Sequence, residues 1–213
     1  MKNPETFFSK EEQRRIEQAV AAAESKTSGE IVPMIVSASA HYSEAELLGV
    51  VFGLIVGTII ELIWHDPWGP VHAYILWPIV GAISGYVASR IPPVKRRIVP
   101  RHRVAEAVHL RSLAAFTGHG LHHTQDETGI LIFASLLEHR VIVLADRGID
   151  AKVEPGTWAS VVGALTDGLK SGNACHGFCK AIERCGEILA THFPARAGDR
   201  NELSNKLVTE SDS

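Results

Sequence analysis

The sequence predicts an α/β protein: a three-layer α/β/α sandwich with a small mixed sheet, interrupted by an inserted two-helix transmembrane hairpin. Two long apolar segments lie close together in the first half of the chain, and helix and strand patterns alternate on both sides of them. The length of 213 residues suits one domain plus an additional element. The expected parts are a split α/β domain (8–40 and 98–194), the hairpin (47–90) and a polar C-terminal tail (195–213).

The first helix and strand are marked by local signals. Ser9 followed by Glu12 forms a capping box, which predicts a helix over residues 10–26 that ends near Gly29. Residues 30–39 follow as a strand rich in branched apolar side chains. Pro33 cannot donate a ladder hydrogen bond, so it indicates an edge position or a bulge.

The two apolar segments, 47–64 and 71–88, are each about 27 Å long as helices, which is close to the ~30 Å hydrocarbon core. The repeated spacing of Gly49, Gly53 and Gly57 permits close helix contact. The aromatic residues near the ends of the segments are typical of a membrane interface, and they are Trp64, Trp68, Tyr74 and Trp77. The alternative, two helices buried in a soluble core, would need a larger protein around them.

Basic residues set the expected orientation of the hairpin. The turn over residues 65–70 has no Lys or Arg, whereas six follow the second segment: Arg90, Lys95, Arg96, Arg97, Arg101 and Arg103. The positive-inside rule therefore predicts that this stretch and both termini lie in the cytoplasm. Beside a membrane helix, such a cluster suits anionic lipid headgroups at the membrane surface.

The second part of the chain continues the α/β pattern. Residues 101–116 are expected to be helical, 129–137 and 141–146 to be strands buried on both faces, and two helices are expected to follow, ending near residues 170 and 191. The tail from Pro194 is polar and is expected to fray.

Carboxylates at strand ends form the candidate metal site: Glu30, Asp126, Asp146 and Asp150. Carboxylate and carbonyl oxygens suit Ca²⁺ or Mg²⁺. Glu30 begins a strand and Asp146 ends one, so they lie at the same end of the sheet only if those strands run antiparallel. The alternative is that all four are ordinary solvated turn carboxylates.

Composition and motifs narrow the function classes. A net charge of −3 argues against a nucleic-acid partner, and the odd number of cysteines, three, predicts reduced thiols in a cytoplasmic compartment. The chain has no phosphate-binding GxxxxGK[ST] loop, GxGxxG turn or GxSxG elbow. No catalytic residue is therefore predicted.

Several short segments, in this order, resemble the TPM domain, which occurs in thylakoid-lumen photosystem II repair proteins and in bacterial membrane-anchored relatives. They are Ser28–Val32, Thr128–Phe133 and Asp146–Ile149. The resemblance implies an α/β/α sandwich, divalent-cation binding in some members and acid phosphatase activity in the plant relatives.

These observations lead to one expected function and one alternative. The expected function is a membrane-anchored, TPM-type interaction or accessory domain in the cytoplasmic membrane of a bacterium, multi-pass, with both termini and the α/β domain cytoplasmic. Its expected partners are the lipid bilayer and a membrane protein complex or further copies of itself. The alternative is a divalent-cation-dependent acid phosphatase on the same scaffold.

Overall fold

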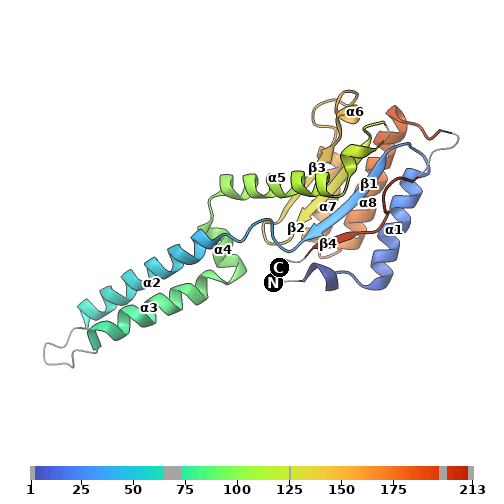
Figure 1. Cartoon of the computed structure of the whole chain (residues 1–213). Coiled ribbons are helices and arrows are strands. Elements are labelled where there is room, and N and C mark those ends of the chain that lie inside the picture. The colour runs from blue at the N-terminus through green and yellow to red at the C-terminus, as the bar shows by residue number, and fades with distance from the viewer. Residues whose placement is uncertain (1–2, 65–72, 125, 197–200, 211–213) are drawn as a thin grey trace. The chain divides into compact units, whose positions relative to one another are not determined.

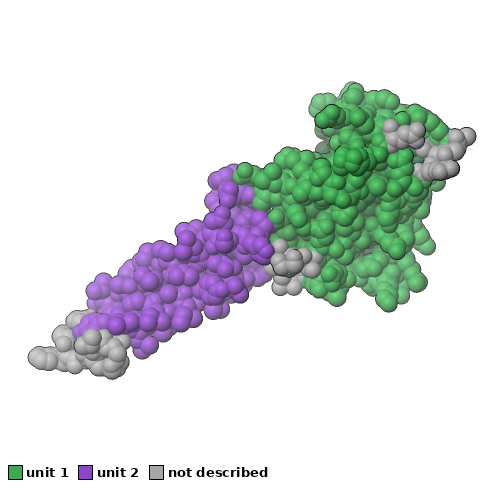
Figure 2. Space-filling view, viewed as in Figure 1, with its two compact units in different colours: residues 1–39, 106–213 green, residues 40–105 purple. Residues whose placement is uncertain are grey.

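The computed structural model describes residues 3–64, 73–124, 126–196 and 201–210 (Figure 1). The chain divides into two compact units (Figure 2): unit 1 contains residues 1–39 and 106–213, and unit 2 contains residues 40–105. The second unit is therefore inserted into the sequence of the first, and each is described by itself.

Unit 1 is built on a four-stranded mixed sheet with the order β3-β2-β1-β4. Its strands are β1 (Glu30–Val36), β2 (Gly129–Ser135), β3 (Arg140–Ala145) and β4 (Val208–Glu210). Strand β1 runs parallel to β2 and β4, whereas β2 and β3 are antiparallel. The expected mixed α/β class with a small mixed sheet is confirmed.

Three helices cover one face of the sheet: α1 (Lys10–Glu24), α7 (Ala159–Lys170) and α8 (Ala174–His192). The predicted capping box starts α1, since the Glu12 amide donates to Ser9 Oγ at 3.2 Å and the Ser9 amide donates to Glu12 Oε2 at 2.8 Å. Apolar side chains of these helices share one buried cluster with Ile31 and Ile35 of β1. Burial of this cluster supplies the main hydrophobic stabilisation of the unit.

The opposite face of the sheet is buried as well. Alternation along the strands turns Val32, Met34 and Phe133 away from the first cluster, and all three are buried. Further helical elements include α5 (Arg101–Gly118), which enters the unit at Glu106 and has buried side chains such as Val108 and Phe116. The 3₁₀ turn η2 (Leu121–His123) packs on β2. Burial on both faces explains the nearly unbroken apolar runs of β1 and β2.

Unit 2 holds the helices α2 (Ser43–Ile63), α3 (Ala73–Ser89) and α4 (Pro92–Ile98). By length and composition, α2 could cross a bilayer. Helix α3 meets the same criterion only when it is taken together with α4, and the two are bent by 96° relative to each other. The expected turn over residues 65–70, with Trp68, lies outside the described residues, as do the first residues of the second apolar segment.

The packing within unit 2 places small residues inside and large apolar residues outside. The buried residues of α2 are Ala45, Gly49, Gly53 and Gly57, whereas Phe52 and Leu62 are 69% and 72% exposed. A Cβ at Gly53 would overlap the carbonyl oxygen of Gly81 on α3. The predicted glycine-mediated helix contact is therefore confirmed.

Five short elements were not predicted: the 3₁₀ turns η1 (Pro4–Thr6) and η2, the helices α4 and α6 (Arg147–Asp150), and β4. The expectation that the tail frays was wrong for residues 208–210, which pair with Met34–Val36. The ion pair between Arg111 and Glu210 also attaches β4 to α5. Pro33 lies just outside the stretch of β1 that β4 covers, which suits its missing N–H.

Candidate functional site

Three strand ends lie together at one end of the sheet: the start of β1, the start of β2 and the end of β3. Because β1 is parallel to β2 and β2 is antiparallel to β3, β1 and β3 run in opposite directions. Glu30 pairs with Gly129, and the amide of Asp146 donates to the Gly129 carbonyl at 2.9 Å. The condition for bringing Glu30 and Asp146 to the same end is met, with Gly129 between them. At the usual strand spacing their Cα atoms are about 10 Å apart.

Asp146 is the N-cap of α6, and its Oδ1 accepts the Arg147 amide at 2.8 Å. The residue is only 8% exposed. Its second oxygen, Oδ2, is buried and has no hydrogen-bond partner within the described parts of the chain. An orphaned carboxylate oxygen is costly to bury, and a cation is one group that would offset this cost.

The loop before β2 packs closely on α6. The Gly148 amide donates to the Glu127 carbonyl at 3.1 Å. A Cβ at Gly148 would lie 2.6 Å from the Asp126 carbonyl oxygen and 2.7 Å from that of Glu127, so only glycine fits without a shift. Glu127 itself has a φ of 53°, in the left-handed region. Two backbone carbonyls are thus held beside the turn that carries Asp146.

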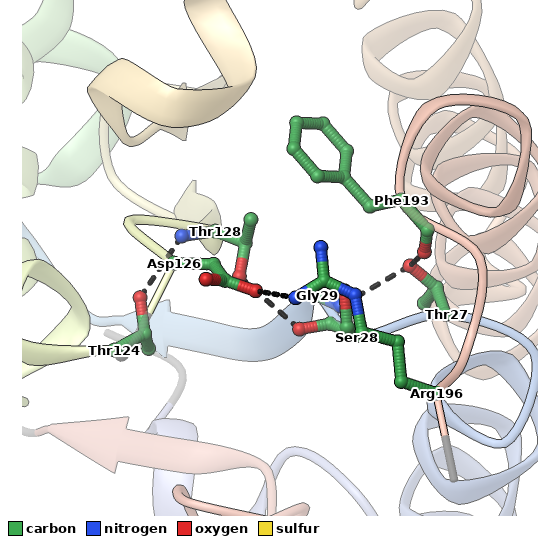
Figure 3. Close-up of polar contacts among 8 residues, drawn as sticks. All are labelled: Thr27, Ser28, Gly29, Thr124, Asp126, Thr128, Phe193 and Arg196. Carbon is green, nitrogen blue, oxygen red and sulfur yellow. Dashed lines mark hydrogen bonds and ion pairs between the residues drawn. The ribbon is translucent and has the colours of Figure 1, made fainter. Parts of the chain in front are cut away.

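Figure 3 shows the polar contacts that join this loop to the start of β1. Thr128 donates from Oγ1 to the Ser28 carbonyl at 3.1 Å and from its amide to Thr124 Oγ1 at 3.0 Å. The Gly29 amide donates to Thr27 Oγ1 at 3.1 Å. These short polar residues therefore hold the starts of β1 and β2 together.

The remaining predicted ligands are placed differently. The Asp126 carboxylate forms an ion pair with Arg196, with 2.7 Å between Oδ2 and Nη1 (Figure 3). Asp150 is exposed in α6. Both Glu30 oxygens accept backbone amides, from Glu202 at 3.0 Å and Leu203 at 3.3 Å. Across the residues that the structure describes, no three His, Cys, Asp or Glu side chains form a metal-binding group.

A second polar site, which the sequence did not predict, lies where α1 ends. Glu24 accepts the Ile31 amide at 2.9 Å through Oε1 and the Asn205 side-chain amide at 2.8 Å through Oε2. Burial raises the pKa of the Glu24 carboxyl to about 8, and the neighbouring Glu30 carboxylate contributes to this rise. A cavity of about 250 Å³ lies here, lined by Glu24, Glu30, Asn201, Asn205 and small neighbouring residues.

This site closes the outer edge of β1. The Glu30 amide donates towards β2, to the Thr128 carbonyl at 3.1 Å, so the amides of Ile31 and Ile35 point to the opposite side. Glu24 accepts the Ile31 amide, and Pro33 has no N–H. Strand β4 covers the stretch of β1 that contains Ile35. The C-terminal segment is thus held on β1 by side chains as well as by a short ladder.

The cysteines carry no sign of reactivity. All three are free thiols, and Cys175 and Cys185 are buried. Burial raises the pKa of Cys185, and it also raises the pKa of Cys179, to about 11. At neutral pH these thiols stay protonated, which disfavours nucleophilic or metal-ligating roles.

Comparisons with known proteins show the fold alone. No family model matches the chain, and no curated protein matches it in sequence. The NMR structure of the BA42 protein from the psychrophilic bacterium Bizionia argentinensis is similar, with a TM-score of 0.63 and 20% identity. That likeness covers 99% of this chain and 100% of the other.

Proposed function

We propose that unit 2 anchors this chain in a lipid bilayer and that unit 1 is a TPM-type accessory domain on the cytoplasmic side. The observation that carries the anchor is the packing of α2 and α3. Large apolar side chains point outwards and glycines point inwards, which is unfavourable in water and typical of helices surrounded by lipid. On this proposal the chain is a three-layer domain with an inserted membrane hairpin, in a bacterial cytoplasmic membrane, where it assists a membrane protein complex.

Membrane extraction tests the anchor. The full chain should stay in the membrane pellet after both a high-salt wash and an alkaline carbonate wash, because an inserted hairpin is held by apolar burial. Release by salt alone would show a peripheral, electrostatic association, and release by carbonate would contradict the spanning hairpin.

The accessory domain is further proposed to bind Ca²⁺ or Mg²⁺ through Asp146, together with Asp126 or Asp150. Support comes from the unpartnered Oδ2 of Asp146 and from the carbonyls of residues 126 and 127 beside it. A hard cation prefers such oxygen ligands. Because Glu30 is engaged by two backbone amides, it is the weakest candidate of the predicted set.

Thermal unfolding of the full chain in detergent tests the cation. A ligand that binds only the folded state stabilises it by about 2.7 kcal/mol at a hundredfold excess over Kd. The melting temperature should rise with Ca²⁺ or Mg²⁺ and return with chelator. Asp146→Asn should abolish the rise and leave the metal-free melt nearly unchanged, since Asn caps a helix as well as Asp.

Asp167→Asn is the matched control, because Asp167 is an exposed carboxylate on α7. This variant should respond to cations like the wild type. If wild-type melts ignore both cations and chelator, the carboxylates are ordinary turn residues. Turnover of a generic phosphomonoester that depends on the cation would instead favour the phosphatase alternative.

A further inference from the structure

The basic residues after α3 fall into two groups, and the first group forms ion pairs within unit 2. Glu46 lies 3.8 Å from Arg90 and 3.6 Å from Lys95, and Glu44 lies 2.8 Å from Arg103. Both carboxylates belong to the first turn of α2, where the helix dipole favours negative charge. These ion pairs connect the start of α2 to the chain that follows α3.

The second group is exposed and lies between the paired residues in sequence. It consists of Arg96, Arg97 and Arg101, all with exposed side chains. Arg97 and Arg101 form no ion pair with any acidic side chain in the described parts of the chain. Positive charge therefore remains available on this short stretch after the ion pairs are formed.

Helix α4, which carries Arg96 and Arg97, lies at a large angle to α3. The two helices are bent by 96° at the break after Ser89 (Figure 1). When α3 crosses a bilayer, a helix at a right angle to it lies along the membrane surface. Ile91, which precedes α4, is 48% exposed, so an apolar side chain accompanies the cations. A short basic segment with such a side chain suits the headgroup layer.

We propose that Arg97 and Arg101 bind the phosphate groups of anionic phospholipid headgroups, with α4 lying along the cytoplasmic surface of the membrane. The inference rests on the proposed membrane anchor and names the lipid class that the anchor prefers. Guanidinium groups bind phosphate through paired, charge-assisted hydrogen bonds. Arg90, Lys95 and Arg103 lie beside Glu44 or Glu46, so the preference is expected to depend mainly on Arg97 and Arg101.

Lipid retention by the full chain measures this preference. The protein is purified in mild detergent from an equimolar mixture of phosphatidylglycerol and phosphatidylcholine, and the retained lipids are counted by native mass spectrometry. The wild type should retain mainly phosphatidylglycerol. Each basic residue near an anionic surface is worth about fivefold in binding, so Arg97→Gln with Arg101→Gln should reduce the preference by up to about thirty-fold.

Two controls separate site binding from net charge. Lys10→Gln with Arg14→Gln removes two exposed cations from α1 in unit 1 and should leave the preference unchanged. Glu44→Gln with Arg103→Gln removes an ion pair at constant net charge and should also leave it unchanged.

Equal retention of the two lipids by the wild type would overturn the proposal, as would an equal loss in the α1 control. Neither result would contradict the proposed membrane anchor, because the carbonate wash reports insertion independently of the lipid class. Loss of insertion in that wash would overturn the anchor itself.

Discussion

Glu24 shows how one side chain can link the charge state of the protein to its stability. The carboxyl is half-buried beside Glu30 and has a pKa of about 8 in the folded chain, against an ordinary value of 4.5. The folded state therefore binds this proton more tightly than the unfolded state does. By linkage, the contribution of Glu24 to stability is greatest below about pH 4.5, falls as the pH rises towards 8, and is constant above that.

Glu24→Gln should remove this part of the pH dependence, because the amide imitates the protonated carboxyl. Urea unfolding of both proteins in detergent between pH 5 and about pH 9 measures it. The variant should gain stability relative to wild type as the pH rises. A constant difference across this range would show that Glu24 has the same pKa in both states. Glu11→Gln, at an exposed position of the same helix, serves as the control.

For single residues, the sequence indicates which side chains could take part in a site, but it does not indicate which groups they contact in the fold. Asp146 was recognised because an acidic residue followed a buried strand, and the structure adds its orphaned oxygen. Nothing in the sequence distinguishes Glu24 from other acidic residues near a helix end. Its role depends on Asn205, which is distant in sequence and arrives only through the path of the C-terminal segment. No local pattern reports such a contact.

The α2–α3 pair depends on the absence of side chains at its contact. At Gly53 even a methyl group would overlap the backbone of Gly81, so Gly53→Leu must force the helices apart. Overpacking of this kind costs about 1–3 kcal/mol or more. The melting temperature of the full chain in detergent should fall clearly.

Phe52→Leu introduces the same residue one position away, where the side chain is 69% exposed. It should leave the melting temperature nearly unchanged. A similar fall in both variants would mean that α2 responds to any change in sequence, and the glycine contact would then carry no special weight.

Among the elements, the long helices and the three longer strands follow from periodicity and capping. Helix α1 begins where Ser9 and Glu12 predict it. Strand β4 has only three residues, and its polar surroundings give it no pattern of its own. It exists because Met34–Val36 offer an open edge and because Arg111 binds Glu210. Short elements of this kind are set by tertiary contacts and not by propensity.

The whole molecule has an orientation that can be tested directly. Six basic residues follow the second apolar segment and none lies in the turn before it, so the turn should face the outside. A cysteine introduced at Gly69, in a chain whose native cysteines are replaced, should react with an impermeant maleimide on intact cells. Reaction only after lysis would reverse the predicted orientation.

The split organisation of the chain was predictable because the hairpin interrupts two halves of one α/β pattern. The two compact units follow this organisation, because residues 40–105 interrupt the unit formed by residues 1–39 and 106–213. The path of the last residues across the sheet edge could not be predicted, since it depends on partners from α1, β1 and α5.

The long separation in sequence between β1 and both of its neighbours has a consequence for synthesis. Strand β1 leaves the ribosome long before β2, and at about 5–20 residues per second it waits several seconds for its first neighbour. Its second neighbour, β4, follows β2 in sequence and arrives later still. During that interval a nascent chain exposes a strand edge that could join another polypeptide. Pro33, which interrupts the row of donors on that edge, therefore protects the newborn protein at a stage when its own closing strand has not yet been made.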